Sequence, residues 1–200
     1  MARKKPACAV VDGKLDGSTG VNIFTVLVDY DASLAAKARE LLDYSKRLTY
    51  LSDVVKYPVI VNPSAERRGR EEVQIELVKV VPSGGRMSDQ EVWDEISRRG
   101  YRSAAATELV DLVDQHFDSL VGIRRQEKDR FLSVAALETI FRHPGGNDCV
   151  IYLSMGSSWC YLSYPTVGDG RGGFGRTLGS GEYRSRDWDD HWWFAAVRKG

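Results

Sequence analysis

The sequence has few of the residues that build metal centres and disulfide frameworks. It contains three cysteines (Cys8, Cys149 and Cys160) and three histidines, with no C-x-x-C pair and no histidine at ligand spacing from a cysteine. An odd, scattered set of cysteines is typical of reduced thiols in the cytoplasm. We therefore expect a cytoplasmic protein, with a disulfide between Cys149 and Cys160 across neighbouring strands as the alternative.

Net charge and long apolar runs are also missing. The 28 basic and 28 acidic residues cancel, so no overall field attracts nucleic acid or an anionic membrane. No apolar run approaches the ~20 residues of a membrane span. The "ACAVV" near the start is too short for the apolar part of a secretory signal. The composition predicts a soluble protein without a nucleic-acid or membrane partner.

The motifs of common nucleotide and hydrolase sites are absent as well. "GDGRGG" (168–173) places its last glycine one position early for G-x-G-x-x-G, and no GK[ST] follows it. "GSSW" (156–159) precedes Cys160, where a nucleophile elbow requires glycine. The sequence therefore does not favour an enzyme. A hydrolase that uses Cys149 or Cys160 with a histidine is kept as an alternative.

An acidic cluster near the C-terminus raises the question of a metal. Asp187, Asp189 and Asp190 with His191 could offer ligands to a divalent cation, but they lack the register of an EF-hand loop. Asp189 and Asp190 are adjacent, so in a strand their side chains point to opposite faces. We expect neither a metal nor a cofactor.

What the chain does have is a clear alternation of predicted strands and helices. The clearest strand is "EEVQIELVKVV" (71–81), in which Val73, Ile75 and Leu77 face one way and the alternate residues the other. The clearest helix is "SDQEVWDEISRRG", with a capping box from Ser88 to Glu91 and an apolar stripe of Val92, Trp93 and Ile96. Further segments are predicted as a strand at 22–30, a helix at 31–44, an extended piece at 59–62, a helix at 103–117, and strands at 149–155, 157–164 and 192–199.

These elements predict an α+β protein. We expect a flexible arm at 1–20, an α/β N-terminal part at 21–117, and a mostly antiparallel C-terminal part at 118–200. The N-terminal part is a strand, helix and strand followed by a helical hairpin of the two helices after position 88. His116 lies beside the apolar face of the second helix and is interpreted as a helix-end residue. The segment 130–142 suits helix or strand equally.

The segment before the last strand has the composition of a recognition surface. In "EYRSRDWDDHWW", tyrosine and tryptophan supply rigid contact area while short polar residues supply directional bonds. A glycine-rich stretch at 166–183 leads into it. The predicted binding residues are Tyr183, Arg184, Ser185, Asp187, Asp189, Asp190, His191 and Trp192. Because a strand alternates, Trp192 and Trp193 must face opposite ways, so we expect Trp188 and one of this pair to be buried.

Two resemblances accompany these patterns. "RRGYRSAAATELVDLVDQH", "GGNDCVIYLS", the glycine stretch and "DWDDHWWFAAVRK" together resemble a family of small bacterial proteins without an established activity. These proteins end in D-W-x(4)-R-F-L-A-V-R-K, and the likeness covers roughly residues 22–199. This resemblance implies a fold boundary and not a function.

The end of the chain also resembles the end of C-type-lectin-like domains. Trp188, Phe194, Val197 and Arg198 match the pattern shared by the formylglycine-generating-enzyme group and the variable proteins of diversity-generating retroelements. The resemblance implies a lectin-like C-terminal part, and it places on the variable binding face the residues Tyr183, Ser185, Asp187, Asp189, Asp190, His191 and Trp192. It carries over no catalytic cysteine pair.

The leading hypothesis is a non-enzymatic binding module that recognises a macromolecular partner, expected to be a protein, through the glycine-rich loop and the polar-aromatic segment. A second hypothesis is a mobile-element or phage accessory protein that inhibits a host enzyme through an acidic surface. The cysteine-dependent hydrolase is the third.

Overall fold

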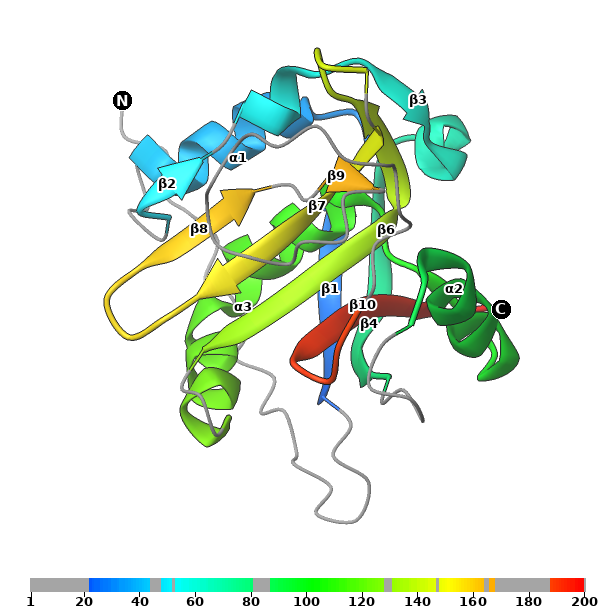
Figure 1. Ribbon diagram of the computed structural model, residues 1–200. Coiled ribbons are helices and arrows are strands. Elements are labelled where there is room, and N and C mark those ends of the chain that lie inside the picture. The colour runs from blue at the N-terminus through cyan, green and yellow to red at the C-terminus, as the bar shows by residue number, and fades with distance from the viewer. Residues whose placement is uncertain are drawn as a thin grey trace.

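The computed structural model describes residues 22–43, 48–51, 53–80, 87–127, 131–146, 148–163, 166–167 and 188–199. In these residues, three α-helices and two short 3₁₀ helices accompany one sheet of ten strands (Figure 1). The helices are α1 (Leu34–Asp43), η1 (Asp53–Lys56), η2 (Pro63–Glu66), α2 (Asp89–Arg98) and α3 (Ala106–Gln126). The strands are β1 (Asn22–Asp29), β2 (Tyr50–Leu51), β3 (Val59–Val61), β4 (Arg70–Lys79), β5 (Tyr101–Ser103), β6 (Leu132–Arg142), β7 (Asp148–Met155), β8 (Cys160–Ser163), β9 (Thr166–Val167) and β10 (Trp192–Arg198).

The sheet is curled and mostly antiparallel. Its strands follow the order β1-β4-β10-β6-β7-β8-β2, while β3 pairs with β6, β5 with β10 and β9 with β7. The pairs β10–β6 and β2–β8 are parallel, and the others are antiparallel. The expected mixture of helices with a mostly antiparallel sheet is therefore confirmed, and strands from both halves of the sequence share one sheet.

Side chains on the two faces of the sheet build two separate apolar cores. On β10, Ala195 and Val197 belong to the first core, whereas Phe194 and Ala196 belong to the second. The first face is covered by α3, which packs on β1, β6 and β7, and α1 packs in turn on α3. Figure 1 shows α3 behind β6 and β7, whose other face is turned to the viewer.

The predicted helical hairpin is wrong. Strand β5 separates α2 from α3, and β5 pairs with β10 inside the sheet. Val92 and Ile96 of α2 enter the second core, whereas α3 supplies the first, so the two helices lie on opposite faces. A three-residue strand such as β5 is too short to show a periodic pattern, so the sequence does not distinguish it from a turn between two helices.

The edge of the sheet at β1 is covered by polar side chains of α3. The Gln115 side chain accepts a hydrogen bond from Leu27 N (2.9 Å) and donates one to Leu27 O (2.8 Å). His116 Nε2 lies 2.8 Å from Thr25 O, and Asp111 accepts from Asp29 N. These bonds replace those of a neighbouring strand and so protect an edge that would otherwise invite association.

The prediction that His116 ends its helix is wrong. Its backbone is non-helical (φ −125°, ψ 26°), which kinks α3, but the helix continues to Gln126. The kink turns the imidazole toward the β1 backbone, where its ring also meets Phe24 with centroids 5.2 Å apart.

No helix in the described part of the chain combines the length and apolar character that a membrane crossing needs.

Candidate functional site: an aromatic row beside the C-terminal strand

The predicted binding segment is only partly described. Asp189, Asp190, His191 and Trp192 form the turn that leads into β10. The other predicted binding residues lie outside the described residues, as does the glycine-rich stretch; they are Tyr183, Arg184, Ser185 and Asp187.

The three C-terminal tryptophans have different environments. Trp188 is 1% exposed and forms an isolated backbone bridge with Met87. Trp193 is buried on the first face of the sheet, whereas Trp192 is half-buried on the second. The prediction that Trp188 and one of the adjacent pair would be buried is confirmed, and strand alternation is the reason.

Trp192 belongs to a row of aromatic side chains that runs along the second face of the sheet. We call Trp192, Tyr152, Tyr161 and Trp159 the aromatic row. Ring centroids are 5.2 Å apart for Trp192 and Tyr152, 6.4 Å for Tyr152 and Tyr161, and 4.8 Å for Tyr161 and Trp159. The first two contacts are edge-to-face and the last is stacked, which are the favoured geometries of aromatic pairs.

Strand pairing brings these four residues together. Tyr152 lies on β7, Tyr161 faces Ser154 of the same strand from β8, and Trp192 pairs with Ser133 of β6. All four side chains in the row are half-buried, so each presents part of its ring at the surface. The row therefore extends from β10 across β6 to the consecutive strands β7 and β8.

One end of the row continues into the second core. The ring of Trp192 meets Trp188 edge-to-face (4.9 Å), and Trp188 meets the fully buried Phe194 (5.1 Å). The Trp188 Nε1 donates a hydrogen bond to Asp89 Oδ1 (2.5 Å), which ties this end to α2. Because the row is anchored on a packed core, its rings are held in a defined arrangement.

The other end of the row rests on a glycine. Gly156 and Trp159 close the turn between β7 and β8 through a bond from Gly156 N to Trp159 O (2.8 Å). A Cβ at position 156 would lie 2.2 Å from the Trp159 ring, so the indole packs directly on the glycine backbone. Gly156 is therefore needed for close approach, and the "GSSW" stretch is a hairpin turn and not a nucleophile elbow.

Polar groups accompany the row on the same face. The buried hydroxyls of Ser133 and Ser154 lie 3.2 Å apart beneath it. Burial raises the pKa of Tyr161, against a hydrogen bond with Ser154 that lowers it. At the Trp192 end, the exposed Asp190 carboxylate lies 3.9 Å from His191 Nε2. The row thus combines large aromatic surfaces with hydroxyls and carboxylates.

The acidic turn does not gather into a metal centre. Among the described residues, no group of three or more histidine, cysteine or carboxylate side chains is placed to hold a metal ion. The Asp189 carboxylate instead accepts a hydrogen bond from His191 N (3.1 Å), which shapes the turn before β10.

The two described cysteines lie in the first core. Cys149 and Cys160 are free thiols, and Cys160 pairs with Met155, six positions along β7 from Cys149. Six strand residues span roughly 20 Å, which is too far for a disulfide. Burial raises the pKa of each thiol to about 12, with a smaller contribution from Asp148 at Cys149. The structure therefore offers no support for a cysteine nucleophile.

We expect both buried thiols to resist modification in the folded protein. A raised pKa suppresses the thiolate, which is the form that attacks a disulfide reagent, so labelling at neutral pH should require unfolding. The measurement is a colorimetric thiol assay on the Cys8→Ser variant with and without denaturant. Rapid labelling of either thiol in the folded variant would show that the thiol is accessible and would revive the hydrolase hypothesis.

A buried ion network lies near the start of α3. The Glu108 carboxylate is fully buried and accepts bonds from Arg102 Nη2 (2.7 Å), Tyr30 Oη (2.6 Å) and Arg67 Nη1 (3.1 Å). Arg102 also pairs with Glu138 (2.8 Å). Burial raises the pKa of Glu108, but hydrogen bonds and charge from Arg102 and the bond from Tyr30 outweigh it, so the pKa lies below its usual value.

This network joins several elements of the fold. Its members come from the end of β1, the residue after η2, β5, α3 and β6. The two arginines and two glutamates balance, and the carboxylate of Glu108 also caps the helix by accepting from Ala105 N (2.8 Å). We interpret the network as the joint that fixes α3 to the sheet.

Three members of the aromatic row have no signal of a site in the sequence. The patterns predict strands that contain Tyr152, Trp159 and Tyr161, and the alternation of "SSWCYLSY" predicts that Trp159 and Tyr161 share one face. Their proximity to Trp192 depends on the order of strands in the sheet, which the alternation does not encode.

Comparisons with families of known proteins, with curated proteins and with solved structures found no match.

Proposed function

We propose that the protein is a non-enzymatic binding module whose protein partner docks on the aromatic row and the acidic turn beside it. The observation that carries this proposal is the assembly of four half-buried aromatic side chains, from β7, β8, β10 and the turn between β7 and β8, into one continuous surface. Trp192 and the acidic residues Asp189 and Asp190 belong to the segment that the sequence pattern had indicated.

The chemistry of the row suits protein recognition. Tryptophan and tyrosine dominate the binding energy of protein interfaces because they bury much surface at little cost in conformational entropy. Tyrosine hydroxyls and the carboxylates of the turn add directional bonds. The anchoring of Trp192 on Trp188 favours this role further, because a rigid surface loses less entropy on binding.

The lectin-like origin of the C-terminal part stays a prediction, and the proposed docking surface does not depend on it. The inhibitor hypothesis is a special case in which the partner is a host enzyme. Identifying the partner would distinguish an inhibited host enzyme from another protein. The docking surface is therefore tested by an experiment that captures the partner at a defined residue.

We expect site-specific photo-cross-linking, in cells that naturally express the protein, to detect the partner at the aromatic row. A benzophenone amino acid in place of Tyr161 should give a discrete adduct, which mass spectrometry identifies. The same probe in place of Trp93 is the matched control, because Trp93 is a 38% exposed aromatic residue of α2 outside the row. The adduct should disappear when Asp189→Ala and Trp192→Ala are added.

The identified partner is then purified and its affinity is measured directly. Trp192→Ala should weaken binding at least about tenfold, as hot-spot tryptophans do, while Trp93→Ala leaves it unchanged. Near-ultraviolet circular dichroism checks that each variant is folded, since Trp192 also contacts Trp188. Identical adducts from both probe positions, or an affinity insensitive to Trp192→Ala, would contradict the proposal.

A further inference from the structure

A second surface feature lies far from the row along the chain, between α1 and the segment β2–η1. It is a pocket of about 310 Å³, which is at the lower end of the range for small-molecule sites. One wall is the side of α1 that carries Ala35, Arg39 and Leu42, whose spacing places them on one side of the helix. The opposite wall supplies Leu51 and Val55.

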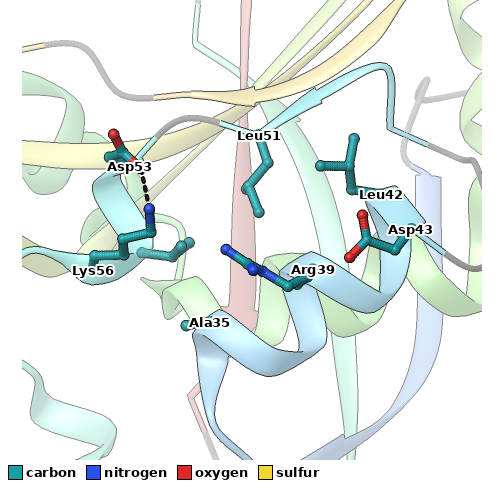
Figure 2. Close-up of a pocket in the computed structure, with 8 residues that line it drawn as sticks. Ala35, Arg39, Leu42, Asp43, Leu51, Asp53 and Lys56 are labelled. Atoms are coloured by element: carbon teal, nitrogen blue, oxygen red, sulfur yellow. Dashed lines mark hydrogen bonds and ion pairs between the residues drawn. The ribbon is translucent and has the colours of Figure 1, made fainter.

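Arg39 is the central polar group of this pocket. Figure 2 shows its side chain extending between Leu51 and Lys56 and away from Asp43, although Asp43 is one turn along the same helix. Within the described residues, Arg39 makes no hydrogen bond or ion pair. Its planar guanidinium therefore keeps its fork of donors, which matches the two oxygens of a carboxylate.

The other charges of the pocket lie at its rim. Lys56 pairs with Asp53 (2.5 Å), but both side chains are more than half exposed, so this pair is weak and Lys56 can turn toward a bound anion. Asp43 and Asp53 balance the two cations, so the lining carries no net charge and an anion is held by its direct contact with Arg39. The apolar side chains of Leu42, Leu51 and Val55 offer contact to a short hydrocarbon group.

We propose that this pocket binds a small organic anion, a monocarboxylate attached to a short apolar chain. The carboxylate pairs with the Arg39 guanidinium, and the chain lies against Leu51 and Val55. Arg39 is exposed, so the affinity relies on the two-point geometry of the guanidinium–carboxylate pair together with the apolar contact to Leu51 and Val55. This site is independent of the aromatic row, so either proposal can fail without the other.

The test is a titration of the isotopically labelled full chain with hexanoate, followed through the methyl resonances of Leu51 and Val55. We expect saturable shifts of these methyls. Arg39→Gln should weaken the affinity about tenfold, the effect of losing one charge-assisted hydrogen-bond pair. The matched control is Arg125→Gln, an exposed arginine near the end of α3, which should leave the affinity unchanged.

Two further ligands make the outcome decisive. Hexanol should bind at least about tenfold more weakly than hexanoate, because it lacks the charge; equal affinities would show an apolar pocket only and overturn the proposal. Inorganic phosphate should not compete; tighter binding of phosphate would overturn the assignment to a monocarboxylate. Unshifted Leu51 and Val55 methyls throughout the titration, with a well-dispersed spectrum, would also overturn it.

Discussion

Replacement of Glu108 by glutamine should destabilise the protein by roughly 3–5 kcal/mol, the cost of removing one partner from a buried ion pair. The substitution keeps the shape of the side chain but leaves Arg67 without the Glu108 carboxylate and Arg102 with Glu138 alone. Because domains are stable by only about 5–15 kcal/mol, this loss is a large fraction of the total. Urea unfolding followed by circular dichroism measures it.

The pH dependence gives this prediction a second readout. The pKa of Glu108 lies below its usual value in the folded state, so its contribution is complete above the unfolded pKa of about 4.3. The contribution is lost as the pH falls through the folded pKa, where the wild-type carboxyl is itself protonated. The difference in unfolding free energy between wild type and Glu108→Gln should therefore shrink in strong acid.

Glu95→Gln is the matched control for Glu108→Gln. Glu95 also pairs with two arginines, Arg98 and Arg99, but it lies on the surface of α2. Solvent-exposed pairs contribute at most about 1 kcal/mol, so this variant should unfold almost as the wild type does. Similar losses in the two variants would mean that burial of the Glu108 network does not matter to stability.

Trp188→Ala should cost about 3–5 kcal/mol, as truncation of a fully buried aromatic residue does. The indole packs edge-to-face on Phe194 and Trp192, and its Nε1 bonds to Asp89 at the start of α2. Its removal opens a cavity in the second core and also releases one tie between α2 and the C-terminal segment. The free energy of unfolding in urea is again the measurement.

Trp93→Ala provides the comparison for this variant, because it removes the same side chain from an exposed position on α2. Its effect should stay within about 0.5 kcal/mol, apart from the small gain in helix propensity. A loss at Trp188→Ala no larger than this would show that Trp188 is not part of the core. A Trp188→Phe variant should fall between wild type and alanine, because it keeps most of the ring packing.

Local pattern predicted those elements that depend on a single segment. The alternation in β4 correctly placed Val73, Ile75 and Leu77 in one core and Val78 in the other. The capping box of α2 is present, with Ser88 N donating to the Glu91 carboxylate (2.7 Å). In both cases the signal lies within about ten residues, where backbone geometry alone decides which side chains share a face.

Features that depend on long-range pairing were not predicted. The apolar stripe expected on α2 included Trp93, yet only Val92 and Ile96 reach the second core, and α2 packs mainly on β5. The pairing of Glu108 with Arg102 and Arg67 joins residues up to 41 positions apart. Charged residues are mostly found at exposed surfaces, so the sequence does not indicate which of them form buried ion pairs.

The position of β10 in the sheet has a consequence for how the chain folds. Among the strands that the structure describes, β10 alone connects the ladder β1–β4 with the ladder β6–β7–β8. The pairing of Val197 with Ile75 closes a loop of more than a hundred residues. Contacts between residues so far apart in sequence form late and slowly, because the entropy of closing the loop is lost before the contacts are made. We therefore expect folding to be slow and to wait for the arrival of this strand during synthesis.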